Sequence, residues 1–367
     1  MTRHGLIHAG LIDCDVHISP PEAPRLFPYL EPHWREYVDL AAYKLPASVS
    51  VTYPPGAPTT KTNEAVINGE WTVEREYELL RINVLERRET SIAILTCFWG
   101  VEVINNPDFS VAAAAAVNDW VREHWLERDH RLRGSLVVTP QNPEAAAAEI
   151  DRMASDSRFA QVLLPVRSER PYGHRRFFPI FEAAQRNGLP VALHFGGMTG
   201  LPPTPSGWPS SYVEDYVVMA QVFQSQLVSM IASGVFDQYP KLRLVLLEGG
   251  FTWLPPLLWR LDAKWKGMQR EAPWVRRPPS QYVAEHVRIG IQPLDRPVSV
   301  ERLIEVLDQM PSRDLLVFTS DYPHVHASDV DEFLGDVPPS LAAQIASENA
   351  RRVYGDRAAA ASSTAGV

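Results

Sequence analysis

Short apolar runs rich in β-branched residues alternate along the chain with longer amphipathic stretches. The short runs have the length of buried strands, and the longer stretches have helical periodicity, so the chain predicts parallel β-α-β units. Eight runs of the strand type lie at residues 10–16, 91–96, 134–139, 160–164, 190–194, 242–247, 286–291 and 315–319. The helical patterns lie at about 74–89, 110–129, 142–155, 175–188, 213–233, 251–269, 299–310, 328–335 and 339–353.

Polar residues interrupt the apolar strands at their C-terminal ends. These residues are His17, His194, Glu248, Gln292 and Asp321. A closed barrel of eight β/α units gathers its chemistry at this end of every strand. An open doubly wound sheet would place its site at one switch point, usually with a phosphate-binding glycine loop, and the sequence contains no such loop. The pattern therefore predicts an α/β fold, a (β/α)₈ TIM barrel.

The chain of 367 residues is long enough for this barrel and one insertion. Residues 40–73 fit neither a strand nor a helix and contain several prolines. We interpret them as an insertion after the first strand, either a lid or a subunit contact. Residues 358–367 are small and polar, which predicts a disordered tail after a single domain that spans residues 1–357.

The first strand ends in three alternating titratable residues, Asp13, Asp15 and His17. Alternation along a strand would place all three on one face. Inside a barrel they would destabilise the fold by several kcal/mol unless paired or bound to a metal. The alternative is a solvated strand end. Asp15 and His17 are the better metal ligands of the three, whereas Asp13 is expected to orient His17 or an arginine.

His194 ends the fifth strand and Asp321 follows the eighth. Taken singly, His194 could be a structural histidine and Asp321 could cap a helix. In a barrel, however, both would converge with Asp15 and His17 on one pocket. Two imidazoles and two carboxylates suit a divalent metal, with Zn²⁺ as the first expectation and Mn²⁺ or Fe²⁺ as alternatives.

These motifs resemble those of the amidohydrolase superfamily, in the branch typified by aminocarboxymuconate-semialdehyde decarboxylase and the resorcylate and vanillate decarboxylases. The resemblance covers nearly the whole chain, from about Leu11 to Gly355. It implies a barrel fold and a metal site in which the first-strand pair falls on Asp15 and His17. The fifth-strand histidine then falls on His194 and the eighth-strand aspartate on Asp321. The matching stretches are residues 12–17, 190–194, 239–250, 318–324 and 348–355.

The chain departs from this branch after the sixth strand, where Glu248 replaces the acid/base histidine that the resemblance implies. Glu248 could act as the base, serve as a fifth metal ligand, or pair with an arginine such as Arg288. The resemblance places His324 in the pocket as a substrate-binding or supporting residue, and it assigns His326 nothing beyond support of a ligand. Asp321, Glu248 and His324 are the catalytic candidates.

The sequence and the resemblance together predict a metal-dependent hydrolase or lyase that acts on a small carboxylated or carbonyl substrate through a metal-activated water. Asp321 or Glu248 would move the proton, and the loss of the sixth-strand histidine favours hydrolysis over decarboxylation. A second hypothesis is a subunit of a two-component Mn/Fe or di-iron monooxygenase of the isobutyrate hydroxylase type, as the oxygenase or its Zn-bearing partner. A third is a metal-binding structural subunit without turnover.

Composition narrows the range of partners. The formal net charge is −9 and no cluster of lysine and arginine occurs, which argues against nucleic acid and anionic membrane as partners. Two cysteines and the lack of a long apolar run or leader predict a cytoplasmic protein. The expected assembly is a homo-oligomer, or a hetero-oligomer with a paralogous subunit.

Overall fold

A computed structural model describes residues 10–43, 53, 61–62, 71–197, 202–326 and 329–359. All eight predicted strands are present, and they form one parallel sheet in sequence order. The strands are β1 (Leu11–His17), β3 (Thr90–Thr96), β4 (Leu132–Val137), β5 (Phe159–Arg167), β6 (Val191–Gly197), β7 (Leu244–Leu247), β8 (Val287–Gly290) and β9 (Leu316–Val317). The predicted fifth, sixth and eighth strands are therefore β6, β7 and β9.

The first and last strands meet and close the sheet. The backbone N–H of Cys14 donates to the carbonyl of Phe318 at 2.9 Å, and that of His17 donates to the carbonyl of Tyr322 at 2.7 Å. Val16 and Tyr322 also form a parallel bridge. Closure removes the two open edges of the sheet. The molecule is a (β/α)₈ barrel, which confirms the predicted fold class.

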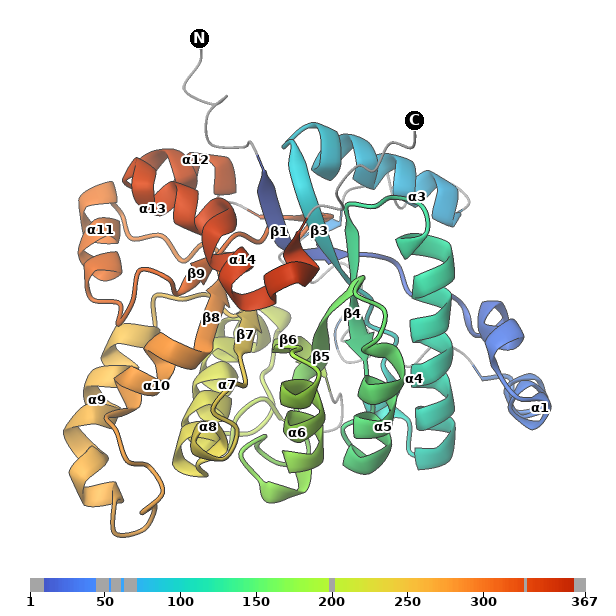
Figure 1. Cartoon of the computed structure of the whole chain (residues 1–367), viewed down its shortest axis with the longest axis horizontal. Helices are drawn as coiled ribbons and strands as arrows, with labels where there is room; N and C mark the ends of the chain where they lie inside the picture. Colours follow the sequence, from blue (N-terminus) through green and yellow to red (C-terminus); the bar gives the residue numbers. More distant parts are fainter. Residues whose placement is uncertain are drawn as a thin grey trace.

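Helices surround the strands (Figure 1). They are α1 (Pro32–Leu40), α3 (Val73–Leu80), α4 (Pro107–Val121), α5 (Pro143–Met153), α6 (Phe178–Arg186), α7 (Tyr212–Ala232), α8 (Val235–Gln238), α9 (Leu254–Met268), α10 (Pro279–His286), α11 (Val300–Asp308), α12 (Val330–Asp336), α13 (Pro339–Ala343) and α14 (Asn349–Tyr354). Neither α1 nor α10 was predicted. Each begins at a proline, which fits the first turn of a helix because its missing N–H would have no partner there.

The core has two parts, one inside the barrel and one between the strands and the helices. Ile12, Cys14 and Leu163 belong to the inner part, together with Tyr354 of α14. The Tyr354 hydroxyl donates to Gln161 Oε1 at 2.8 Å, near the start of β5. Helix α14 therefore covers the N-terminal end of the barrel, which leaves the opposite end for chemistry.

Most of the inserted segment, residues 40–73, lies outside the described residues, as do residues 360–367 of the predicted tail. Within the insertion, the short strand β2 (Lys61–Thr62) pairs antiparallel with β10 (His324–Val325), just after the eighth barrel strand. Ala358, which was expected in the tail, is instead buried at the end of a short 3₁₀ turn. No helix in the described ranges is long and apolar enough to span a bilayer.

Candidate metal centre

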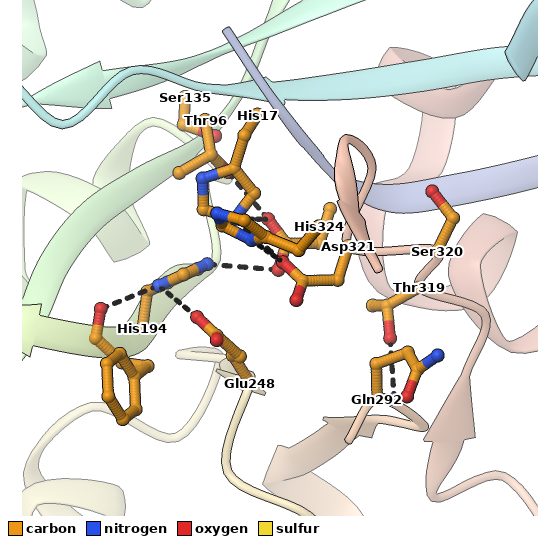
Figure 2. A network of polar contacts seen from close by, with 12 residues as sticks. His17, Thr96, Ser135, His194, Glu248, Gln292, Thr319, Ser320, Asp321 and His324 are labelled. Carbon is orange, nitrogen blue, oxygen red and sulfur yellow. Dashed lines mark hydrogen bonds and ion pairs between the residues drawn. The ribbon is translucent and has the colours of Figure 1, made fainter. Parts of the chain in front are cut away.

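Four side chains from the ends of three barrel strands converge on one point, as the sequence predicted. Asp15 and His17 come from β1, His194 from β6, and Asp321 follows β9. Each offers one ligand atom, and these four atoms lie within 4.8 Å of one another. Figure 2 shows His17, His194 and Asp321 pointing toward the same centre. All but His17, which is 16% exposed, are essentially buried.

The backbone turns sharply at two of the carboxylates. Asp321 has φ 57° and Glu248 has φ 59°, which is the left-handed region that residues other than glycine seldom adopt. Each such residue stores about 1–3 kcal/mol of strain, and strained residues of this kind cluster at functional sites. Glu248 immediately follows β7 and Asp321 lies four residues after β9, so the turn at each position directs the side chain toward the centre of the site.

Asp15 is held by two groups. Its Oδ1 accepts a hydrogen bond of 2.8 Å from the Thr96 hydroxyl, which comes from the end of β3. Its Oδ2 lies 3.0 Å from His194 Nε2. The other nitrogen of that ring, Nδ1, lies 2.8 Å from the carbonyl of Phe195 and donates to it. This bond fixes the ring so that Nε2 faces the centre, which is the usual way to orient a metal-binding histidine.

Three imidazoles surround Asp321. His17 Nε2 lies 2.9 Å from its Oδ1, and His324 Nδ1 lies 3.1 Å from the same oxygen. His326 Nε2 contacts Oδ2 at 2.5 Å. Burial alone would raise the pKa of Asp321, but the close contacts with the three rings hold that pKa well below its usual range. Asp321 is therefore an anion at neutral pH.

The two ligand histidines differ in charge in the metal-free protein. Burial lowers the pKa of His17, which favours the neutral ring that a metal requires. Burial acts in the same direction on His194, but the adjacent Asp15 outweighs it and raises the pKa of His194 to about 9. A metal entering this site must therefore displace a proton from His194.

The donor set fits a divalent metal. Two imidazole nitrogens and two carboxylates form a hard-to-borderline set of the usual size for Zn²⁺, Mn²⁺ or Fe²⁺. His17 Nε2 is buried and, although it lies close to Asp321, it makes no hydrogen bond of acceptable geometry with any described residue. A buried nitrogen lone pair that faces two carboxylates through the same small space is explained by a bound cation.

Glu248 lies beside this group rather than within it. Its Oε2 is 3.8 Å from His194 Nδ1, and the side chain points toward that ring (Figure 2). Burial, followed by repulsion from Asp321, raises the pKa of Glu248 to about 8. The pairing with Arg288 considered above does not form, because that guanidinium donates to the backbone carbonyls of residues 284 and 287. Glu248 instead forms a second possible metal-binding group with Asp321 and His324.

The role expected for Asp13 is wrong. The register of β1 is irregular between Asp13 and Val16, so simple alternation does not hold there. Asp13 Oδ1 accepts hydrogen bonds from the backbone N–H groups of Ser320 at 2.9 Å and Asp15 at 3.3 Å. Asp13 therefore fixes the chain around the ligands Asp15 and Asp321, and it orients neither His17 nor an arginine.

Sequence reasoning missed two neighbours of the site and undervalued a third. Thr96 ends an apolar strand, as the ligands do, and that position was a usable signal. Phe98, whose ring lies 4.8 Å from that of His194, follows two residues later. His326 was given only a supporting role. Its contact with Asp321 depends on the course of the loop after β9, which the periodicity of the sequence does not predict.

Comparison with known proteins identifies the class. The pattern of the amidohydrolase family matches residues 12–355, and the chain belongs to this family. It is 25% identical over 280 residues to the γ-resorcylate decarboxylase of Rhodococcus jostii (strain RHA1), covering 69% of this chain and 79% of that one. It is 22% identical over 326 residues to the γ-resorcylate decarboxylase of Rhizobium sp. (strain MTP-10005), covering 81% of this chain and 94% of that one.

A crystal structure of similar fold is that of 5-carboxyvanillate decarboxylase from Sphingomonas paucimobilis, with a TM-score of 0.68, 21% identity, and coverage of 94% of this chain and 98% of that chain. Dihydroxybenzoic acid decarboxylase from Polaromonas sp. JS666, solved with bound manganese and the inhibitor 2-nitroresorcinol, gives a TM-score of 0.65 and 19% identity, with coverage of 95% and 97%. At these identities the likeness establishes the barrel fold.

Proposed function

We propose that this protein is a metal-dependent lyase that decarboxylates a hydroxylated aromatic acid. The single observation that supports this most is a buried carboxyl group, Glu248, beside a group of four side chains that can hold a metal. The curated relatives act as decarboxylases, and the chain aligns with 94% of the length of one of them. Aromatic rings beside the ligands, at Phe98 and Phe195, suit a planar substrate.

A bound divalent metal would supply a Lewis acid that orients and polarises the substrate carboxylate. Asp15, His17, His194 and Asp321 would hold it. Because Asp321 remains ionised, it serves as a ligand and cannot donate a proton. Glu248 has a proton to give near neutral pH.

The proposed reaction breaks the bond between the ring carbon and the carboxylate. The electron pair of that bond stays on the ring carbon, which takes the proton of Glu248, and CO₂ leaves. His324 is 26% exposed, and its pKa is raised to about 9 by Asp321 against the effect of burial. Its ligand atom lies within 4.8 Å of that of Glu248. His324 can therefore return a proton from solvent to Glu248 after each turnover.

This proposal replaces the preference for hydrolysis that the missing sixth-strand histidine suggested. Decarboxylation needs a proton donor at that position, and a buried carboxyl group with a raised pKa meets the need as an imidazolium would. The sequence shows only the change of residue type, whereas the buried surroundings of Glu248 supply its acidity.

The proposal is tested with protein reconstituted separately with Mn²⁺, Zn²⁺ and Fe²⁺ and incubated with a panel of mono- and dihydroxybenzoates. We expect release of CO₂ together with the corresponding phenol. In D₂O the phenol should carry one deuterium at the carbon that lost the carboxylate. Hydrolysis of esters, amides or lactones without CO₂ release from any acid would contradict the proposal.

A second candidate is a subunit of a two-component monooxygenase, and one observation favours it. Glu248, Asp321 and His324 form a second ligand group that shares Asp321 with the first, which is how a two-metal centre is arranged. Two Mn or Fe ions per chain in protein purified without added metal, and co-purification of a paralogous subunit, would support this candidate. One metal per chain would favour the lyase.

A further inference from the structure

A buried ion pair lies at the C-terminal end of β5, on the same side of the barrel as the metal centre. Arg167, the last residue of β5, pairs with Asp215 of α7, and their side chains are 6% and 0% exposed. The pair uses only part of its hydrogen-bonding capacity. Arg167 Nε and Asp215 Oδ2 are buried and have no partner among the residues described. Each unused buried group destabilises the fold unless a ligand or water satisfies it.

Aromatic rings connect this pair to the metal centre. The ring centroids of Tyr53 and Tyr212 are 5.7 Å apart, those of Tyr212 and Tyr216 are 6.2 Å apart, and those of Tyr216 and Phe195 are 5.5 Å apart. Phe195 directly follows the ligand His194. We call Tyr53, Tyr212, Tyr216 and Phe195 the aromatic row.

Two hydroxyl groups of the aromatic row are available for a ligand. Those of Tyr53 and Tyr216 are buried, and neither has a hydrogen-bond partner in the described part of the chain. Burial raises the pKa of both hydroxyls. The charge of Asp215 adds to this rise at Tyr53, whereas the charge of Asp321 adds to it at Tyr216.

We infer that Arg167, Asp215 and the hydroxyl of Tyr53 form a subsite for a hydroxyl group on the far side of the substrate ring from the metal. This inference rests on the proposed function. A hydroxyl group can accept from Arg167 Nε and donate to Asp215 Oδ2, so it uses both free groups. A second carboxylate would be repelled by Asp215 and would leave Oδ2 without a donor. The subsite thus selects hydroxylated monocarboxylates over dicarboxylates.

The test is a comparison of ligand affinities for the full chain loaded with Mn²⁺, measured by calorimetry. The reference ligand is 2-hydroxybenzoate, and the probes are 2,4- and 2,5-dihydroxybenzoate. Their controls are 2-hydroxyterephthalate and 4-hydroxyisophthalate, which carry a carboxylate where each probe has its added hydroxyl. We expect one dihydroxybenzoate to bind about tenfold more tightly than the reference, the value of one good hydrogen-bonded group. The matched dicarboxylate should bind no more tightly than 2-hydroxybenzoate.

Two variants assign this advantage to the subsite. Tyr53→Phe removes one hydroxyl and keeps the ion pair, whereas Asp215→Asn removes the charged acceptor. In each, the tenfold advantage should fall to about threefold or less, while the affinity for 2-hydroxybenzoate is retained. Tyr37→Phe and Asp151→Asn are the matched controls, since Tyr37 is exposed and Asp151 forms an exposed ion pair with Arg186. If Asp215→Asn fails to fold, Tyr53→Phe still tests the subsite.

The inference is overturned if the probes bind no more tightly than the reference in the unmodified chain, or if the advantage survives in both variants. Each titration is repeated with the Glu248→Gln variant, in which turnover is slowed, so the outcome of binding is separate from that of the proposed reaction. An advantage that depends on Asp215, with no CO₂ release from any acid, would keep the subsite and reject the lyase. CO₂ release without a gain in affinity for either dihydroxybenzoate would support the lyase and reject the subsite.

Discussion

Glu248 and Asp321 are similar carboxyl groups that carry different charges because their neighbours differ. Three imidazole rings contact Asp321, which is an anion. Glu248 lies 3.8 Å from the ring of His194, and burial together with repulsion from Asp321 raises its pKa to about 8. In many active sites, one carboxyl group with a raised pKa acts as the acid. A second one with a lowered pKa stays charged and acts as a ligand or base.

Removal of a ligand should release the metal. We expect His194→Ala and Asp321→Ala each to weaken metal binding by more than the 10–100-fold typical of supporting residues. His130→Ala is the matched control, because that side chain is 67% exposed and lies outside the ligand group. Metal content by elemental analysis and affinity by calorimetry check this. Full occupancy in both ligand variants would show that the assignment is wrong.

Glu248→Gln should separate a proton-transfer role from metal binding. The amide has nearly the same shape but cannot deliver the proton, so we expect kcat to fall about 10²- to 10⁴-fold. The affinity of the four-ligand site should change little, because Glu248 is not one of its members. Loss of one of two metal ions in this variant would instead support the two-metal candidate.

Metal uptake should release a proton from His194. The pKa of this residue is about 9 without metal, so at pH 7.5 the ring is protonated, whereas metal binding requires it neutral. Apparent affinity should therefore rise about tenfold per pH unit up to pH 9. Calorimetry in buffers of different ionisation enthalpy counts the protons released. The finding of none at pH 7.5 would contradict the assigned charge.

At the scale of elements, the junction between β1 and the segment after β9 both closes the barrel and builds the site. The N–H of Asp321 donates to the carbonyl of Asp15 at 3.1 Å, and the N–H of Ser320 donates to Asp13 Oδ1. Two ligands are thus placed by the same hydrogen bonds that join the first and last strands. A change at this junction should affect stability and metal binding together.

Asp13 should make stability depend on pH. Burial raises its pKa from 3.8 to about 7 in the folded protein, so the folded state favours the neutral form. Stability is then greatest below the unfolded pKa and is lost as pH rises through the folded one. Between pH 5 and 8 the metal-free protein should lose roughly 2–3 kcal/mol from this group.

Asp13→Asn keeps an oxygen acceptor and removes the charge, so its stability should fall less over the same pH range. Denaturant unfolding of the metal-free protein at pH 5 and pH 8 measures this difference. Asp13→Ala is the comparison that also removes the acceptor, and it should be the less stable variant at both pH values. Equal pH dependence in the unmodified chain and in Asp13→Asn would contradict the assignment.

At the scale of the whole molecule, the barrel brings together residues that are 306 positions apart in the chain, from Asp15 to Asp321. Helix α14 closes one end of the barrel, and the ligands occupy the other. The carboxylates Asp15 and Asp321 are buried there and close to each other. Among the described residues, the histidine rings are the groups that can offset this charge in the metal-free protein.

Metal should therefore stabilise the entire fold. At a free metal concentration 100-fold above Kd, the expected gain in unfolding free energy is about 2.7 kcal/mol. Addition of a chelator should lower the melting temperature, and Mn²⁺ or Zn²⁺ should restore it. The His194→Ala variant is the control, because it should show a much smaller shift. No shift in the unmodified chain would argue against a site that is formed only in the folded state.

The sequence by itself determined the eight strands, the barrel and the convergence of four candidate ligands, because strand periodicity is local and barrel strands bring their C-terminal ends to one place. It did not predict α1 or α10, which are short and start at prolines in regions that resemble loops. It gave Asp13 the wrong role, because an irregularity in the register of β1 breaks the alternation that would have placed Asp13 on the same face as His17.

Only the tertiary structure decided the charges of the site residues and which side chains lie next to them. The acidity of Glu248, the three imidazoles around Asp321 and the free edge of the Arg167–Asp215 pair each depend on burial and on contacts between distant segments. A carboxyl group has the same chemistry in any sequence context until its solvent and its partners are set. The residue types made a metal barrel predictable, and their packing decides which of them remains a proton donor.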